Sequence, residues 1–171
     1  PVAGQENVPG MCDKEGYLWR GVLDTATNAT GEEIEKEIRA QLERAISRGI
    51  RPSHIDTHMG TLYARLDYTQ AYLKVAEEYR IPAMVIELTP PVVTKFRKQG
   101  YPITKESIKQ ISFYSLPKLD DFHAAPEADS YEGKKDEFFK LVRSMRPGIN
   151  EVIFHPSIQT EGLKRITNSW Q

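Results

Sequence analysis

The sequence predicts an α/β protein in which helices lie outside a parallel sheet or barrel. Helical and strand patterns alternate along the chain, the strand pattern at 81–88 is short and mostly apolar, and no repeat or linker interrupts the order. Such alternation favours parallel strands joined by helices. A chain of 171 residues can bury a core of its own. Residues 1–171 are therefore interpreted as one α/β domain.

The first elements are a turn-rich opening and a strongly marked helix. Residues 12–21, CDKEGYLWRG, have the acid–glycine turn and following aromatics of a short hairpin or surface loop. Thr30 and Glu33 then stand at capping-box spacing, and the helical pattern ends at Gly49. Apolar residues recur on one face between these points. The spacing predicts a helix over 30–49.

A strand, a helix and a second strand are expected next. Residues 51–58 have an alternating strand pattern, and residues 66–80 place apolar side chains at helical spacing. Residues 81–88, IPAMVIEL, suit a strand that is covered on both faces.

The second half of the chain continues the alternation with weaker signals. We expect a loop with a helical turn at 90–102, a helix at 104–116, a polar loop at 117–133, a helix at 134–145 with Phe138, Leu141, Val142 and Met145 inward, a strand within 146–157 and a helix at 160–170. Structureless loops of the length of 117–133 are uncommon in compact domains. The part from Asp120 to His123 is expected either to cover a ligand or to be solvated.

Bulk composition excludes several classes of function. A formal net charge of −1 provides no basic field for nucleic acid, and no apolar stretch is long enough to span a membrane. Cys12 is the single cysteine, so it forms neither an internal disulfide nor a thiolate metal site. A cytoplasmic location is expected. The chain begins without Met and ends within a helical pattern, so both ends are expected to be truncations of a longer protein.

A row of polar residues marks the segment SHIDTHMG. In an extended strand, His54, Asp56 and His58 point to one face, whereas Ile55 and Thr57 point to the other. Buried polar groups need partners, so the row indicates either a functional site or an edge strand with its polar face in water. The spacing alone favours neither interpretation.

Three strand patterns end in side chains that could bind a metal ion. His58, Glu87 and His155 would meet where the carboxyl ends of parallel strands meet, which is where such folds bind ligands. Two imidazoles with open positions suit a divalent metal, but catalytic sites usually have three protein ligands. Glu87 is either the third ligand or a structural glutamate bonded to a loop amide. Asp56 is better placed to orient an imidazole than to bind beside it.

Four segments carry a family resemblance over nearly the whole chain. GIRPSHIDTHMGTLY and EVIFHPS, together with VPGMCDKEGYLWR and SLPKLDDF, resemble the YdjC-like (ChbG/HpnK) carbohydrate deacetylases. The resemblance implies a deformed parallel (β/α) barrel of the glycoside hydrolase/deacetylase type, of which this chain would hold an incomplete piece.

The resemblance also implies an activity and roles for particular residues. It implies a divalent-metal-dependent hydrolase, with Mg or Zn, that removes N-acetyl groups from amino-sugar oligosaccharides, in which His58 and His155 bind the metal and Asp56 assists catalysis. The implied partner is a small carbohydrate, with neither nucleic acid nor membrane, and a homodimer is the assembly considered. The family's remaining carboxylate ligand and base belong to an ADDxG segment that this sequence lacks, and they are expected upstream of Pro1.

Two departures from the family pattern leave the substrate open. Gly60 stands where relatives that act on chitooligosaccharides continue H-x-H, and Ser157 replaces the glycine after HP. Two alternatives therefore remain: a metal-dependent hydrolase of another bond on the same fold, and a non-catalytic carbohydrate-binding module.

Overall fold

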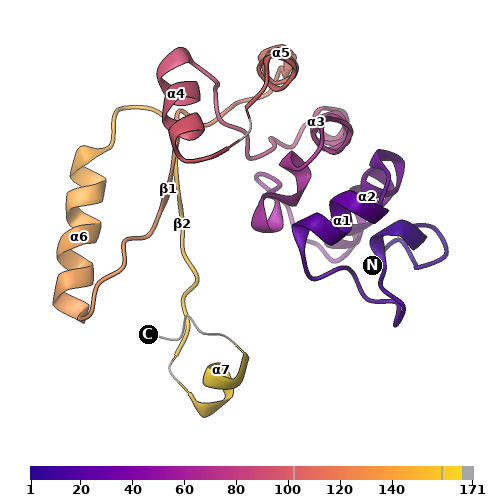
Figure 1. Ribbon diagram of the computed structural model, residues 1–171, viewed down its shortest axis with the longest axis horizontal. Coiled ribbons are helices and arrows are strands. Elements are labelled where there is room, and N and C mark those ends of the chain that lie inside the picture. The colour runs from indigo at the N-terminus through magenta and orange to yellow at the C-terminus, as the bar shows by residue number, and fades with distance from the viewer. Residues whose placement is uncertain (102, 159, 167–171) are drawn as a thin grey trace. The chain divides into compact units, whose positions relative to one another are not determined.

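The computed structural model describes residues 1–101, 103–158 and 160–166 (Figure 1). The chain divides into two compact units, Pro1–Lys118 and Leu119–Gln171. The first unit contains η1 Pro9–Met11, α1 Val22–Asn28, α2 Gly31–Ser47, η2 His58–Tyr63, α3 Leu66–Tyr79, α4 Pro90–Lys98 and α5 Lys105–Phe113. The second unit contains β1 Asp121–Ala124, α6 Tyr131–Ser144, β2 Asn150–Ile153 and α7 Glu161–Ile166. None of the described helices is both long and apolar enough to cross a membrane.

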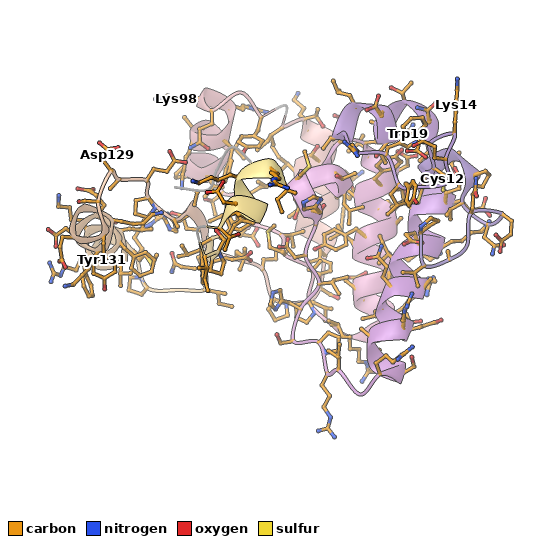
Figure 2. All side chains as sticks on the ribbon, turned by 90° about the horizontal axis from the view of Figure 1, so that it is seen from below. Cys12, Lys14, Trp19, Lys98, Asp129 and Tyr131 are labelled. Carbon is orange, nitrogen blue, oxygen red and sulfur yellow. The ribbon has the colours of Figure 1, made fainter. Side chains whose placement is uncertain are left out.

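Residues 12–21 form a small hairpin, one of the two forms expected from the sequence, and Cys12, Lys14 and Trp19 of this segment are labelled in Figure 2. Cys12 and Leu18 form an antiparallel bridge across the turn. The Trp19 indole N–H donates to the Gly10 carbonyl at 2.9 Å, which fastens the returning arm. Cys12 is only 7% exposed, and its thiol donates to the Val8 carbonyl at 3.5 Å. Burial raises the pKa of this thiol above its usual value.

The predicted capping box of α2 is confirmed. The Thr30 side chain accepts the Glu33 amide N–H at 3.3 Å, and the Glu33 carboxylate accepts the Thr30 N–H at 2.8 Å. The same carboxylate also accepts the Gly10 N–H at 2.6 Å, which ties η1 to the start of the helix. The helix ends at Ser47, and Gly49 follows with φ of 83°. Local sequence signals thus define both ends of α2.

The core of the first unit lies around α3, which packs against α2. One cluster joins α3 to the N-terminal segment and α2, and the other joins it to the segment after α3 and to the end of α5. The buried members are Val8, Met11, Ala29, Ile34, Tyr68 and Ala71 in the first cluster, and Tyr72, Leu73, Ala76, Ala83, Val85 and Tyr114 in the second. The predicted helix at 66–80 and its apolar face are confirmed.

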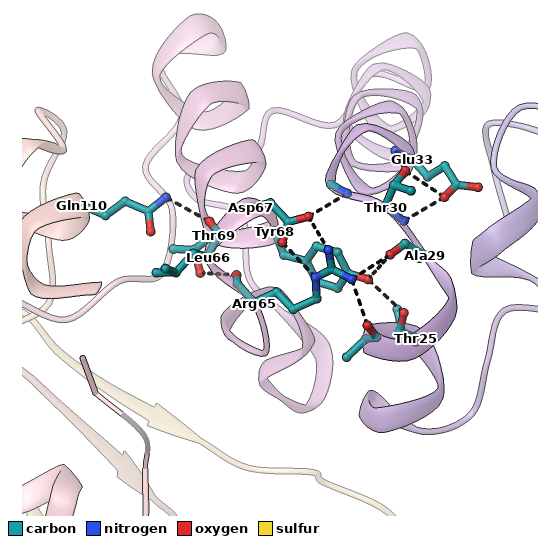
Figure 3. Close-up of polar contacts among 12 residues, drawn as sticks. Thr25, Ala29, Thr30, Glu33, Arg65, Leu66, Asp67, Tyr68, Thr69 and Gln110 are labelled. Atoms are coloured by element: carbon teal, nitrogen blue, oxygen red, sulfur yellow. Dashed lines mark hydrogen bonds and ion pairs between the residues drawn. The ribbon is translucent and has the colours of Figure 1, made fainter. Parts of the chain in front are cut away.

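A polar network fastens the start of α3 to the neighbouring helix ends (Figure 3). Arg65 donates to both Asp67 carboxylate oxygens at 2.9 Å, and its guanidinium lies 4.9 Å from the centre of the Tyr68 ring. The Tyr68 hydroxyl donates at 2.7 Å to the carbonyl of Ala29, the residue that follows α1. Asp67 accepts the Gly31 N–H at 3.1 Å. Unpaired backbone groups at the end of α1 and the start of α2 therefore find side-chain partners.

Ion pairs across α2 and α3 make the first unit sensitive to acid. Glu35 accepts from Lys74 at 2.9 Å and from Arg39 at 2.7 Å. The Lys74 hydrogen bond, followed by that of Arg39, holds the pKa of Glu35 below its usual value. A lowered folded-state pKa stabilises the fold fully above the unfolded-state pKa of about 4.3, and this stabilisation is lost as the pH falls through the folded-state pKa.

Between pH 6 and pH 3 we therefore expect the free energy of unfolding to fall less in Glu35→Gln than in the wild type. The two decreases should differ by up to about 1 kcal/mol. Urea unfolding at the two pH values measures this difference. Glu32→Gln is the matched control, because Glu32 lies on the same helix with its side chain 79% exposed. Equal acid sensitivity of wild type and Glu35→Gln would contradict the expectation.

The strands expected at 51–58 and 81–88 are not continuous, and Ile55 pairs with Ala83 through an isolated parallel bridge. The parallel direction agrees with the sequence, but the expectation of continuous strands is wrong. Two tyrosine hydroxyls add hydrogen bonds to the backbone of these segments. The Ala83 N–H donates to the Tyr114 hydroxyl at 2.7 Å, and Tyr72 bonds both segments.

The loop expected at 90–102 is wrong over its first nine residues, which form α4. Pro90 and Pro91 begin the helix, where a missing N–H leaves no intrahelical bond unmade. Val92, Val93 and Phe96 are buried on one face, and this burial stabilises the helix. The helix expected at 104–116 is confirmed as α5, with the Thr104 side chain accepting the Ser107 N–H at 3.1 Å.

The second unit is a β–α–β segment in which β1 and β2 pair in parallel. Asp121 faces Asn150 and His123 faces Val152 in this register. The polar loop expected at 117–133 is therefore wrong over Asp121–Ala124, whereas the strand expected within 146–157 is confirmed.

The helix expected at 134–145 is confirmed as α6, but its inward face is not. Phe138 and Val142 are 38% and 45% exposed, and α6 has no buried residue. The helix expected at 160–170 is present over Glu161–Ile166, and its last residues lie outside the described part of the chain. The α/β class with parallel pairing is thus observed, and the barrel remains a prediction.

Candidate active site

The polar row of the first unit lies at its surface. His54, Asp56 and His58 are all exposed, whereas Thr57 is buried and Ile55 packs against the second core cluster. The exposure therefore alternates as the sequence predicts. His54 is exposed, and its Nδ1 lies 2.9 Å from the Ser53 hydroxyl.

Backbone and tyrosine contacts hold this segment in place. The Ile55 N–H donates to the Pro82 carbonyl at 2.8 Å, and the Ile55 carbonyl accepts the Met84 N–H at 2.9 Å. The Tyr72 hydroxyl donates to the same Ile55 carbonyl at 2.5 Å and accepts the Met84 N–H at 3.0 Å. Burial raises the pKa of Tyr72 far above its usual value, so the hydroxyl keeps its proton as a donor. Ile55 and Met84 are thus both bonded to a buried side chain.

The chain reverses immediately after this segment, and His58 is the first residue of η2 rather than the end of a strand. Met59 has φ of 56° and ψ of 17°, and Gly60 has φ of 70° and ψ of 18°. A left-handed conformation costs a non-glycine residue about 1–2 kcal/mol, so Met59 is strained. Side chains hold the turn: Thr57 accepts the Leu62 N–H at 3.0 Å, and the Thr61 hydroxyl donates to the His58 carbonyl at 2.8 Å.

Asp56 and Glu87 bond to groups other than the histidines. The Asp56 carboxylate accepts the Thr57 N–H at 2.5 Å, and in the described part of the chain it makes no hydrogen bond to His58. Glu87 accepts from Lys118 Nζ at 2.8 Å, so its partner is an ammonium group rather than the loop amide considered from the sequence. Roles for Asp56 in orienting an imidazole and for Glu87 in binding a metal remain predictions.

The second unit provides two further histidines. His155 is exposed and follows β2 closely, and His123 lies in β1. Because the two strands run parallel, the residues after both of them lie at the same edge of the pair. His123 is not part of a solvated loop: its side chain is 17% exposed, with Nε2 at 3.7 Å from an Asp121 carboxylate oxygen. Nε2 of His123 and Oδ1 of Asn150 are buried and have no hydrogen-bond partner among the residues that the structure describes.

Sequence reasoning gave His123 little weight, although a signal was present. Asp121 and His123 repeat the D-x-H spacing of Asp56 and His58. In both segments the spacing places a carboxylate and an imidazole on one face of extended chain. The polar composition of the flanking residues favoured a loop and concealed this repetition.

Two of these side chains carry imidazole groups, which are of a type that can bind a divalent cation. The imidazoles of His58 and His155 are exposed and make no hydrogen bond among the described residues. Neutral imidazole is a good ligand for zinc. No group of three or more His, Cys, Asp or Glu side chains converges within residues 1–101, 103–158 and 160–166. The described residues therefore provide ligands of the right type but fewer than a catalytic metal usually has.

Comparison with known proteins identifies the family. A family model described as YdjC-like protein matches residues 1–171. This chain belongs to the YdjC-like family. The resemblance carried by the GIRPSHIDTHMGTLY and EVIFHPS segments is thereby confirmed.

Relatives of this YdjC-like chain are named carbohydrate deacetylase. The one from Brevibacillus brevis is 43% identical over 77 residues, covering 45% of this chain and 30% of the relative. The one from Thermoanaerobacter pseudethanolicus is 24% identical over 168 residues, covering 98% of this chain and 59% of the relative. Where nearly the whole chain is matched, it thus spans about three fifths of the relative's length.

A solved structure supports the fold. It is a protein from Enterococcus faecalis V583 that is named for cellobiose-phosphate cleavage. It matches with a TM-score of 0.70 at 19% identity, covering 98% of this chain and 59% of the other. At this identity the likeness concerns the fold alone.

Proposed function

We propose that this YdjC-like chain is part of a metal-dependent carbohydrate deacetylase that removes N-acetyl groups from amino-sugar oligosaccharides. The observation that carries the proposal is the match of the family model over residues 1–171. Relatives named carbohydrate deacetylase support the reaction class.

We assign the metal-binding role to His58 and His155, and the metal to zinc or magnesium. Support comes from their position in the family segments and from the exposed imidazoles, which have no hydrogen-bond partner among the described residues. A bound divalent metal would polarise the acetyl carbonyl and lower the pKa of a bound water. Neutral imidazoles leave that metal more electrophilic than carboxylates would.

We assign Asp56 a catalytic role as an orienting carboxylate. It shares the exposed face of His58, and its backbone is held through Ile55 by the buried Tyr72 hydroxyl. A carboxylate that accepts an imidazole N–H fixes the tautomer and direction of the ring. The proton of the attacking water and that of the departing amine need further acid–base groups.

Acetate release by the full-length protein tests the proposal. N-acetylated chitooligosaccharides are incubated with the protein after chelation and after adding back zinc or magnesium. We expect release of acetate that is lost on chelation and restored by one of the two metals. An O-acetylated sugar ester and a glycosidic substrate serve as matched controls for the bond that is cleaved. Metal binding without acetate release from the amide would contradict the proposal and favour another hydrolase or a binding module.

A further inference from the structure

The turn after His58 has an unusual residue at its first central position. Met59 and Gly60 both adopt positive φ, which is the conformation of a type I′ turn. Such turns favour Asn, Asp or Gly at both central positions, because these residues tolerate the left-handed region. Gly60 meets this requirement, whereas Met59 does not.

Packing within the described chain does not account for Met59. Its side chain is 63% exposed, although apolar burial is the usual compensation for a strained backbone. Asn or Gly at this position would give the same backbone with less strain. An apolar side chain is therefore held in solvent, at an unfavourable conformation, immediately after a proposed metal ligand.

Tyr63 lies against the same turn. A Cβ atom added at Gly60 would be 3.8 Å from Cδ2 of the Tyr63 ring. The Tyr63 hydroxyl donates to the Met84 carbonyl, and its ring meets the buried Tyr72 ring edge-on at 6.3 Å. These contacts fix the ring, yet 39% of Tyr63 stays exposed. A rigid aromatic side chain loses little conformational entropy when it binds a ligand.

We propose that Met59 and Tyr63 form an apolar contact surface for the sugar ring of the substrate, beside His58. Binding sites for small ligands combine apolar and aromatic contact area with a few polar groups, and here Asp56 and His58 would supply the polar groups. A pyranose ring offers the matching chemistry, since its C–H faces are apolar and its edges carry hydroxyls. This inference rests on the proposed function and specifies where the carbohydrate is held.

Substitutions at Met59 test the inference in the full-length protein. Met59→Asn tolerates the left-handed turn but removes the apolar surface, whereas Met59→Leu keeps both the strain and the apolar surface. We expect Met59→Asn to raise KM for N-acetylated chitooligosaccharides about fivefold or more. Its kcat and zinc affinity should stay close to wild type, and its Tm should be equal or higher. Met59→Leu should keep KM within about twofold.

Tyr63 provides a second, independent pair of variants. Tyr63→Leu removes the aromatic surface and should raise KM about fivefold or more, whereas Tyr63→Phe keeps the ring and should raise KM less. The Tm of each variant is measured in parallel. A rise of KM in Met59→Asn without a fall of Tm excludes general unfolding as the cause.

Three outcomes would overturn the inference. The first is an unchanged KM in Met59→Asn. The second is a loss of zinc affinity in Met59→Asn equal to that of His58→Ala, since it would show that the turn only positions the imidazole. The third is the absence of any carbohydrate binding by the wild type.

If the wild type releases no acetate, the proposed function fails. The calorimetric affinity for chitooligosaccharide then replaces KM as the quantity that is compared between the same variants.

Discussion

Replacing His58 by alanine is expected to weaken zinc binding by the full-length protein more than about 100-fold. Loss of a group that merely orients a ligand weakens metal affinity about 10–100-fold, so loss of a ligand itself should have a larger effect. Isothermal titration with zinc and with magnesium measures the affinity. His54→Ala is the matched control, because His54 is exposed on the same segment and its Nδ1 contacts the Ser53 hydroxyl.

Two variants in the second unit identify the second imidazole. We expect His155→Ala to resemble His58→Ala, and His123→Ala to leave zinc affinity near that of the wild type. If His123→Ala lowered the zinc affinity and His155→Ala did not, the second ligand would be His123 in β1 rather than His155. Unchanged affinity in both His58→Ala and His155→Ala would remove the basis of the metal-dependent mechanism.

Tyr72→Ala is expected to destabilise the first unit by about 3–5 kcal/mol. Tyr72 is fully buried in the second core cluster, so truncation removes apolar contacts and leaves a cavity. The variant also removes the hydroxyl that bonds Ile55 and Met84. Urea unfolding measures the change in the free energy of unfolding.

Tyr72→Phe separates the hydroxyl from the ring. We expect a smaller loss of about 1–2 kcal/mol, together with faster hydrogen exchange at the Met84 amide. Tyr79→Phe is the matched control on the same helix, because its hydroxyl bonds Glu43 at the surface. A Tyr72→Phe variant as stable as Tyr79→Phe would contradict the role given to the buried hydroxyl.

The helices could be predicted where their signals are local. Thr30 and Glu33 define the start of α2 by contacts three residues apart, and one apolar face defines α3. A loop with a helical turn was expected at 90–102, although the twin prolines before Val92 are favourable in the first turn of a helix. The position of proline within an element therefore matters more than its presence.

The strands were harder to predict because their partners are distant in the sequence. Ile55 bridges Ala83 across α3, and β1 pairs with β2 across α6. No local pattern indicates that the hydroxyls of Tyr72 and Tyr114 bond the backbone at Ile55 and Ala83. β1 does alternate polar and apolar side chains, but only over the four residues Asp121–Ala124, which lie between polar flanks.

For the candidate site, the side chains that share a face could be predicted, but their backbone turn and hydrogen-bond partners could not. A spacing of two residues placed Asp56 and His58 together, and both are exposed. The strained turn that follows could not be read from the sequence, because methionine is an improbable residue for positive φ. Spacing also does not reveal hydrogen-bond partners such as Lys118 for Glu87.

The buried thiol at Cys12 makes the N-terminal hairpin a natural reporter. The thiolate is the species that attacks alkylating reagents, so a covered sulfur with a raised pKa reacts only when the surrounding chain opens. Because this sequence has one cysteine, labelling of a thiol in it reports on Cys12. Transient opening around η1 can thus be followed in the unmodified protein, without an introduced probe.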